Sequence, residues 1–155
     1  MNTSLVVFPG SNCDKDMTKA IFSVTSKIPR LIWHKERTIE KTDLIIIPGG
    51  FSYGDYLRGG AIAANSPIMN EIIKLSNKGV PILGICNGFQ ILTEAKLLPG
   101  TLIMNNNLKF ICKLINFSIE SLESNFTNRF NKKSVYSLPI AHKMGNYHVN
   151  KKILY

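Results

Sequence analysis

The sequence predicts an open α/β fold of the flavodoxin-like type, with a mostly parallel sheet and helices on both of its faces. The first observation is that short apolar runs alternate with segments whose apolar residues recur at helical spacing. The second is that the runs within residues 43–50 and 80–86 are almost wholly apolar, as strands covered on both faces are. In such a sheet, ligands bind at the carboxyl ends of the strands.

The first part of the chain divides into alternating strands and helices. The second helix is expected to have Ser66 as its N-cap, Pro67 at its first position and Gly79 at its end. In the first helix, Met17 and Ile21 are spaced for one apolar face together with Ala20 and Val24. The predicted strands lie within residues 4–10, 30–34, 43–50 and 80–86, and the predicted helices are residues 14–26, 66–79 and 87–98.

The pattern changes at about Thr101, where strands with turns are expected rather than another strand–helix unit. Residues 124–134 are polar and are predicted to form a loop, and residues 135–150 to hold a strand and a second loop. No internal repeat and no linker is evident. Residues 1–155 are therefore expected to form a single domain.

Composition excludes several classes of protein. The formal net charge is +9, but the 19 basic residues are scattered and form no stripe with aromatic residues, so nucleic-acid binding is not expected. No apolar run approaches the length that spans a membrane, and the N-terminus lacks the basic region of a secretory signal. Three cysteines without a Cys-x-x-Cys pair fit a reducing compartment. The expected location is the cytoplasm, and no metal site is expected.

Cys86 is the strongest candidate for a catalytic residue, at a turn between a central strand and the helix that starts near Asn87. Gly84 and Gly88 flank it at two residues on each side, as a sharp turn that exposes a nucleophile requires. The helix dipole is expected to lower the pKa of the thiol, and the N–H of Asn87 to face a developing oxyanion. Cys86 should then be more reactive than Cys13 or Cys112. The alternative is a small buried cysteine in a strand–helix connection.

A second glycine cluster, residues 48–60 with the sequence PGGFSYGDYLRGG, follows another buried strand. Its backbone N–H groups are therefore expected at the same edge of the sheet as Cys86, where they could supply a second oxyanion donor. A phosphate-binding role is less favoured, because the segment has no G-x-G-x-x-G or Walker pattern.

These residues carry a resemblance to a known family. The segments FPGSNCDKDM, PGGFSYGDYLRGG, GICNGFQIL, LLPG and LPIAH together resemble the glutaminase subunits of phosphoribosylformylglycinamidine synthase, which are class I glutamine amidotransferases of purine biosynthesis. The elbow, which is the turn around Cys86 in GICNGFQIL, would alone indicate only the amidotransferase class. The first two segments are specific to this subunit. The resemblance extends from Val6 to about Tyr147.

The resemblance implies roles for individual residues. Cys86 would attack the side-chain amide of glutamine and form a γ-glutamyl thioester, releasing ammonia. Gly50 and Asn87 would supply the oxyanion N–H groups, and Phe51 and Gln90 would lie at the glutamine site.

The resemblance also implies partners. A large synthetase subunit, which uses ATP and Mg²⁺, would receive the ammonia, and a small accessory subunit would complete the complex. This chain would bind no cofactor. Tyr53 and Arg58 are expected to contact the synthetase.

The sequence departs from the family pattern in one important respect. The family carries its general base and the residue that orients it in a His-Pro-Glu motif, and no such tripeptide occurs here. His142 matches a loop that neighbours the active site and not the base, and His34, at a polar boundary, is expected at the surface. Met104 and Met144 stand where the family usually has Arg and Glu.

Three interpretations remain open. The first is the glutaminase itself, with its domain apparently lacking a C-terminal segment. The second is a truncated, non-catalytic subunit or relic of the same family, which keeps the elbow without the His and Glu of the triad. The third is a reactive-cysteine protein of the wider superfamily, such as a stress chaperone or a peptidase, against which the residue 48–60 segment argues.

Overall fold

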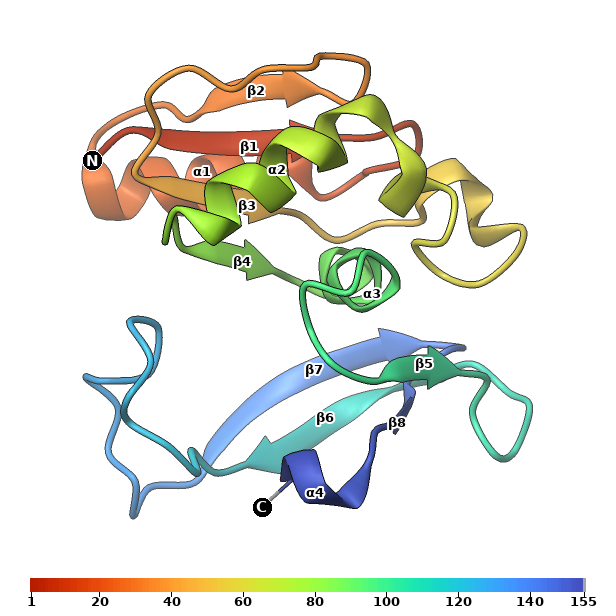
Figure 1. Ribbon diagram of the computed structural model, residues 1–155. Coiled ribbons are helices and arrows are strands. Elements are labelled where there is room, and N and C mark those ends of the chain that lie inside the picture. The colour runs from red at the N-terminus through yellow and green to blue at the C-terminus, as the bar shows by residue number, and fades with distance from the viewer. Residues whose placement is uncertain (155) are drawn as a thin grey trace. The chain divides into compact units, whose positions relative to one another are not determined.

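The computed structural model describes residues 1–154, which divide into two compact units (Figure 1). The first unit comprises residues 1–103 and the described residues from Asn146 onward. The second unit comprises Met104–Gly145. The expectation that residues 1–155 form a single domain stays a prediction.

The first unit begins with strands and helices in the predicted alternation. Two short 3-10 helices, η1 (Ser52–Asp55) and η2 (Ala63–Asn65), lie in the glycine-rich segment between β3 and α2. The remaining elements, in chain order, are β1 (Thr3–Val7), α1 (Asp14–Thr25), β2 (Arg30–Trp33), β3 (Leu44–Ile47), α2 (Pro67–Asn77), β4 (Ile82–Gly84) and α3 (Asn87–Glu94).

The four strands form one parallel sheet in the order β2-β1-β3-β4 (Figure 1). This is the flavodoxin-like order, in which the first strand lies inside the sheet between the second and the third. The predicted fold class is confirmed. A central strand was expected before Cys86. This was wrong, because the strand that precedes it, β4, lies at the edge of the sheet that the described residues form.

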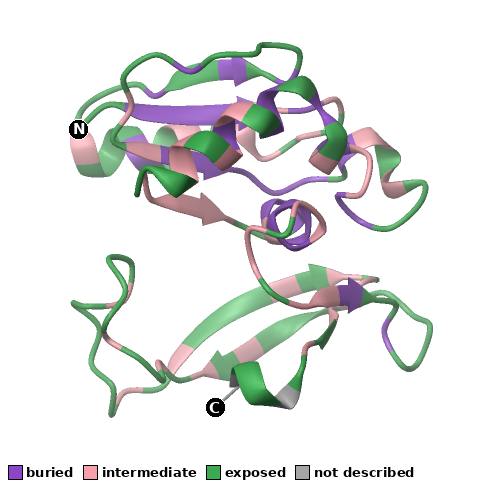
Figure 2. Cartoon of the chain, in the orientation of Figure 1, coloured by how far each residue is buried: buried purple, intermediate pink, exposed green. Residues whose placement is uncertain are grey.

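Alternate residues of the inner strands point to opposite faces of the sheet, and each face has its own apolar core. Leu5 and Ile46 pack with Ile21 of α1 on one face. The larger core lies on the other face and includes residues of α2 and α3; its buried members are Val6, Phe8, Ile32, Ile39, Ile45, Ile47, Ala63, Ile68, Met69, Ile72, Ile91 and Leu92. Figure 2 shows β1 and α3 largely in the colour of buried residues. Full burial of such an aliphatic side chain stabilises the fold by about 1.5–3 kcal/mol.

Helix α1 covers its face less fully than the sequence predicts. Ile21 is buried and Met17 is half-buried, but Ala20 and Val24 are exposed. The spacing of these four apolar residues therefore predicted the helix correctly. It overestimated the width of the buried face, because only a narrow stripe of α1 contacts the sheet.

The chain after Thr101 forms strands, as predicted, and they pair in two antiparallel ladders. In the first unit, β5 (Thr101–Ile103) pairs with β8 (Asn146–His148), and α4 (Lys151–Leu154) follows. In the second unit, β6 (Ile111–Phe117) pairs with β7 (Tyr136–His142) over their full length. The predicted polar loop of residues 124–134 contains no helix or strand.

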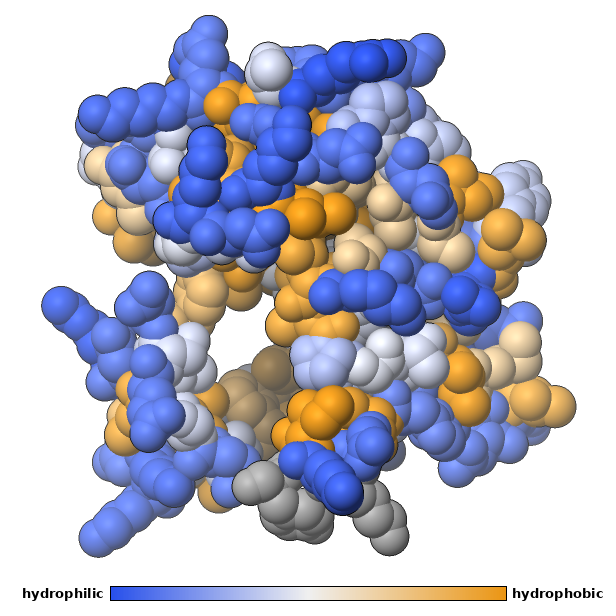
Figure 3. All heavy atoms as spheres, viewed as in Figure 1, coloured by the Kyte–Doolittle hydropathy of each residue, from blue (hydrophilic) through white to orange (hydrophobic). Residues whose placement is uncertain are grey.

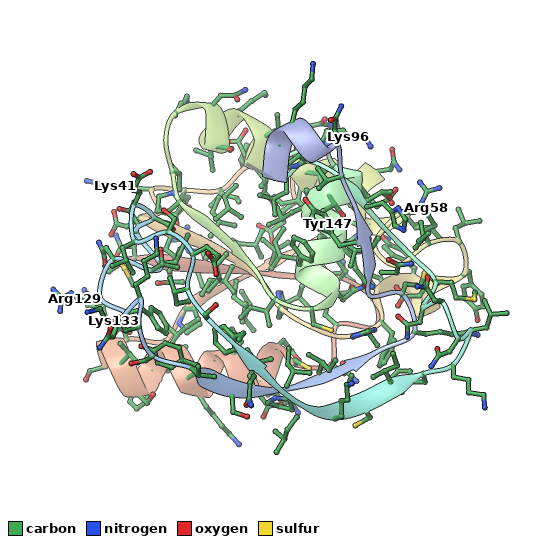
Figure 4. The ribbon with its side chains drawn as sticks, turned by 90° about the horizontal axis from the view of Figure 1, so that it is seen from below. Lys41, Arg58, Lys96, Arg129, Lys133 and Tyr147 are labelled. Carbon is green, nitrogen blue, oxygen red and sulfur yellow. The ribbon has the colours of Figure 1, made fainter. Side chains whose placement is uncertain are left out.

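Hydrophilic side chains cover most of the visible face of the first unit (Figure 3). Its basic residues are dispersed: Lys41 lies on the opposite side of the unit from Arg58 and Lys96 (Figure 4). None of the helices in residues 1–154 is both long and apolar enough to cross a membrane.

Candidate active site

Cys86 lies at the predicted turn, between the end of β4 and the first residue of α3. Its backbone has φ 52° and ψ −108°, a conformation that residues with a β-carbon rarely adopt and that costs about 1–3 kcal/mol. Strain of this kind is typical of the elbow that exposes a nucleophile above a parallel sheet. The residue is exposed to solvent, so it is not a buried filler.

The two flanking glycines are required by space. A β-carbon at Gly88 would overlap the backbone oxygen of Ile47, and one at Gly84 would lie 2.7 Å from the backbone oxygen of Gly88. Larger residues at either position would push α3 away from the sheet. The close packing of strand, turn and helix therefore determines the spacing of glycines around Cys86.

The glycine-rich segment meets the elbow at the carboxyl edge of the sheet, as predicted. Gly50 has φ +140°, and a β-carbon there would lie 2.8 Å from the backbone nitrogen of Asn12 and from the oxygen of Gly10. The next residue, Phe51, donates its backbone N–H to Gly10 at 3.0 Å. Only glycine fits at position 50, and a hydrogen bond from its backbone lowers the pKa of Cys86.

The surroundings raise the pKa of Cys86, contrary to the expectation from the helix dipole. The largest cause is desolvation of the sulfur by the surrounding loops, although the residue as a whole is exposed. Backbone hydrogen bonds from Asn87 and Gly50 lower the pKa, and the nearby Cys13 and Asp55 raise it. The predicted direction was wrong because it considered the helix alone and left out desolvation and the two neighbouring acidic groups.

The backbone groups of Gly50 and Asn87 thus converge on one atom from two different segments. Two N–H groups that can stabilise a thiolate can also stabilise an oxyanion formed next to it. Acyl transfer through a thioester uses donors of this kind beside its nucleophile. Whether the pair acts in this way stays a prediction.

The side chain of Asn87 is buried and links the elbow to the glycine-rich segment. Its Oδ1 accepts a hydrogen bond from the backbone N–H of Ser52 at 3.1 Å. Its Nδ2 donates to Asp55 Oδ1 at 3.1 Å and to Gln90 Oε1 at 2.8 Å. From the sequence, a role was expected for the backbone of Asn87 only, and Asp55 was missed.

Gln90 and Phe51, the other two residues predicted at the glutamine site, differ in exposure. Gln90 is buried in α3, and a β-carbon at Gly59 would lie 2.5 Å from its Oε1, so its amide packs against the glycine-rich segment. The side chain of Phe51 is half exposed, at 51%. Their predicted contact with glutamine stays a prediction.

His34 is buried, with 6% of its surface exposed, so the expectation that it lies at the surface was wrong. Its Nδ1 is 2.8 Å from the hydroxyl of Tyr53, which is also 3.2 Å from Ser66 Oγ. Burial lowers the pKa of His34, and the charge of Lys35 lowers it further. His34 follows the buried Ile32 by two residues, and this alternation along β2 was the signal that could have revealed it.

The two residues predicted to contact a partner both make contacts within the first unit. Tyr53 is partly buried against the larger apolar core. Arg58 forms a bidentate salt bridge with Glu94 of α3, with nitrogen–oxygen distances of 2.9 and 2.7 Å. The hydrogen bonds and charge of Arg58 lower the pKa of Glu94. The Arg58 side chain remains 58% exposed.

His142 belongs to the second unit, at the end of β7, and is held by Asn105. Asn105 Oδ1 is 3.1 Å from His142 Nδ1 and also accepts the backbone N–H of Gly145, while its Nδ2 donates to the backbone oxygen of His142. The arrangement gives this loop a defined conformation within its own unit.

Cys13 lies close to the elbow, whereas Cys112 belongs to β6 of the second unit. A β-carbon at Gly49 would be 3.5 Å from both Cys13 Sγ and Cys86 Cβ. In residues 1–154, no group of three His, Cys, Asp or Glu side chains is arranged to hold a metal ion.

Comparison with known proteins assigns the chain to a family. The model of the CobB/CobQ-like glutamine amidotransferase domain matches residues 1–155. The phosphoribosylformylglycinamidine synthase subunit PurQ of Zymomonas mobilis subsp. mobilis is 51% identical over 148 residues, which are 95% of this chain and 67% of that protein. PurQ of Chlorobaculum parvum is 49% identical over 150 residues, which are 97% of this chain and 60% of that protein.

A solved structure of PurLQS from Thermotoga maritima contains a chain with the same fold. The TM-score is 0.90 at 44% sequence identity, and the match covers 97% of this chain and 70% of that chain. The chain thus spans 60–67% of the length of the two PurQ proteins described above. It belongs to the CobB/CobQ-like glutamine amidotransferase family, within the group of PurQ subunits of phosphoribosylformylglycinamidine synthase.

Proposed function

We propose that the chain is the glutaminase component of a phosphoribosylformylglycinamidine synthase, with Cys86 as its nucleophile. The observation that supports this most is the convergence of the Gly50 and Asn87 backbone groups on the sulfur of Cys86 at a strained turn. Membership of the PurQ group supports glutamine as the substrate and ammonia as the product.

The chemistry follows from this geometry. The Cys86 thiolate attacks the carbonyl carbon of the glutamine side-chain amide. The resulting oxyanion accepts hydrogen bonds from the N–H groups of Gly50 and Asn87. The carbon–nitrogen bond then breaks as the leaving nitrogen takes up a proton and departs as ammonia. Water hydrolyses the γ-glutamyl thioester, which yields glutamate and the free thiol. Phe51 and Gln90 are proposed to border the glutamine.

The step that needs another group is proton transfer. A thiol whose pKa is raised is mostly protonated at neutral pH, so a base must remove its proton before attack. A positioned general acid or base contributes roughly a hundred- to ten-thousand-fold to rate. The sequence contains no His-Pro-Glu tripeptide, so the 155 residues alone are expected to release little ammonia.

Partners are proposed from the likeness to a chain of the Thermotoga PurLQS structure and from membership of the PurQ group. A large synthetase subunit would use ATP and Mg²⁺ and consume the ammonia, and a small subunit would complete the assembly. This chain would itself bind no cofactor. A cytoplasmic location is proposed on the same basis.

A second candidate is a non-catalytic member of the same family. The observation behind it is that residues 1–155 contain no His-Pro-Glu tripeptide. This protein would keep the elbow and the predicted partner contacts Tyr53 and Arg58 but would hydrolyse no glutamine. The two candidates differ in measurable turnover.

The test measures ammonia release from glutamine with the large synthetase subunit and ATP present. It compares this chain, this chain joined to the remaining C-terminal segment of Zymomonas PurQ, and the Cys86→Ala and Cys112→Ser variants of each. We expect the joined chain to turn over, Cys86→Ala to abolish turnover and Cys112→Ser to preserve it. No turnover by a folded joined chain would favour the non-catalytic candidate. Robust Cys86-dependent turnover by the unjoined chain would show that a base lies within these residues, and His142 would be replaced first.

A further inference from the structure

The side chain of Asn87, the residue after the candidate nucleophile, is buried. It is 1% exposed, although its neighbour Cys86 is exposed to solvent. It makes three hydrogen bonds, to the backbone N–H of Ser52, to Asp55 and to Gln90. A buried amide is retained at such a position only when its polar atoms are satisfied, and here two of its partners lie 32 and 35 residues earlier in the chain.

These two partners mark the first and last residues of η1, Ser52 and Asp55. Between them the backbone is irregular: Tyr53, Gly54 and Asp55 all have positive φ, at 53°, 70° and 52°. Non-glycine residues do not stay in this region unless surrounding contacts hold them. The Asn87 amide is therefore well placed to maintain the conformation of η1.

The first residue that Asn87 holds is two positions after Gly50. The backbone of Gly50 hydrogen-bonds the sulfur of Cys86, and so does the backbone of Asn87 itself. Asn87 thus supplies one of the two proposed oxyanion donors with its backbone. Its side chain holds Ser52, two residues after Gly50, which supplies the other donor.

We propose that the Asn87 side chain is a positioning residue that holds the Gly50 segment against Cys86, so that the two oxyanion donors stay in register. The proposal rests on the proposed function of Cys86. The side chain acts through Ser52 and Asp55 and makes no contact with substrate. Its loss leaves the Asn87 N–H in place and releases the Gly50 N–H.

Three hydrogen bonds of Tyr53 also hold this segment, in addition to the bond from the Phe51 N–H to Gly10. The Tyr53 N–H donates to the oxygen of Pro9 at 2.7 Å, and the Tyr53 hydroxyl contacts His34 and Ser66. These contacts attach η1 to the ends of β1 and β2 and to the start of α2. Asn87 is the contact that attaches η1 to the elbow, so its removal is expected to loosen the segment without unfolding it.

The first experiment measures amide hydrogen exchange in Asn87→Ala, with Thr93→Val as the matched control. Thr93 is equally buried in α3, and its hydroxyl bonds within that helix to the oxygen of Gln90. We expect the amide of Ser52 to exchange at least about tenfold faster in Asn87→Ala and to be unchanged in Thr93→Val, because only the first variant removes its acceptor. Equal protection of Ser52 in Asn87→Ala and wild type would overturn the proposal. Should Asn87→Ala fail to fold, Asp55→Ala removes one of the three bonds and is expected to accelerate exchange within η1.

The second experiment measures alkylation of Cys86 by two reagents. A chloroketone analogue of glutamine develops an oxyanion when the thiolate adds to its carbonyl, whereas iodoacetamide reacts by direct displacement and develops none. Removal of one oxyanion donor lowers rates by roughly a hundred- to a thousandfold in enzymes. Because release of Gly50 would also reduce the thiolate fraction of Cys86, the limiting rates of the fully ionised thiol are taken from pH profiles. We expect Asn87→Ala to lower the limiting rate of the chloroketone by at least about tenfold and that of iodoacetamide by less than about threefold.

The two experiments separate the positioning proposal from the function on which it rests. If glutamine does not protect wild-type Cys86 from the chloroketone, the proposed function fails. The hydrogen exchange of the Ser52 amide still tests whether the Asn87 side chain holds the Gly50 segment. If glutamine protects wild type and Asn87→Ala reacts equally fast with the chloroketone, the function stands and the positioning role is rejected. Parallel loss with both reagents would show a general loss of thiol reactivity and would also reject it.

Discussion

Gly88 packs so closely under the end of β3 that a β-carbon on it would overlap the backbone oxygen of Ile47. This contact joins the first turn of α3 to the neighbouring strand and fixes how far Cys86 stands above the sheet. The chain continues from the end of this strand into Gly49 and Gly50, so one contact relates both halves of the proposed oxyanion site.

Gly88→Ala is therefore expected to destabilise the protein and to disturb the elbow. Overpacking of a close contact costs about 1–3 kcal/mol, which a thermal unfolding measurement can detect. Gly79→Ala is the control, because a β-carbon there meets no atom within 4 Å and only its φ of +84° is unfavourable, at about 1–2 kcal/mol. Both variants should lose stability, but only Gly88→Ala should change the alkylation rate of Cys86. An unchanged rate in Gly88→Ala would contradict the inferred role of the contact.

Asp55 raises the pKa of Cys86 through its charge, so Asp55→Asn should lower that pKa and keep the acceptor for Asn87. The pH at which iodoacetamide alkylation of Cys86 reaches half its limiting rate should move downward, and the rate at neutral pH should rise a few-fold. Peptide mass spectrometry at a series of pH values measures both. Asp16→Asn in the first turn of α1 provides a control of equal charge. A profile that stays in place in Asp55→Asn would show that the carboxylate does not act on the thiol.

Cys86 is still predicted to be the most reactive of the three thiols, because the strained turn presents it to solvent, and its raised pKa works against this by lowering its thiolate fraction. Its backbone partners Gly50 and Asn87 stabilise the thiolate directly and offset part of the desolvation. Brief iodoacetamide treatment of the folded protein, followed by peptide mapping, compares it with Cys13 and Cys112. Faster labelling of either of those two would contradict the expectation.

The sequence predicts the order of elements and the elbow well, because each depends on local signals. Apolar runs of four or five residues, Pro67 after Ser66, and the glycines around Cys86 all act within a few positions. What it could not supply were contacts between distant segments. The bonds of Asn87 to Ser52 and Asp55, and of His34 to Tyr53, join residues 19 to 35 positions apart. The sign of the Cys86 pKa shift depends on these same segments, which is why it was mispredicted.

His34 should make stability depend on pH. Its pKa is lowered in the folded state, so the unfolded chain binds the proton first as the pH falls. The contribution of His34 is present above the ordinary histidine pKa of about 6.5 and is lost as the pH falls toward the folded value. Between pH 7 and 5, the free energy of unfolding is expected to decrease by at most about 1.4 kcal/mol per pH unit from this group. His34→Gln should reduce the slope, and an equal slope in His34→Gln and wild type would contradict this assignment.

Arg58 is expected to contribute to docking of the synthetase, and its ion pair with Glu94 allows the contribution to be separated from a structural one. The Arg58 side chain is 58% exposed while that of Glu94 is 11% exposed, so a partner can reach the guanidinium but hardly the carboxylate. Arg58→Ala removes both the exposed charge and the pair, whereas Glu94→Gln removes only the pair. If Arg58 contacts the partner, Arg58→Ala should weaken binding to the large subunit by about tenfold and Glu94→Gln should leave it nearly unchanged. Equal weakening in both variants would mean that the pair only holds the glycine-rich segment on α3, and unchanged binding in Arg58→Ala would exclude the contact.

Titration of the labelled chain with the large subunit measures the affinities, and Tyr53→Phe, which keeps the packing of the ring, tests the second predicted contact in the same assay.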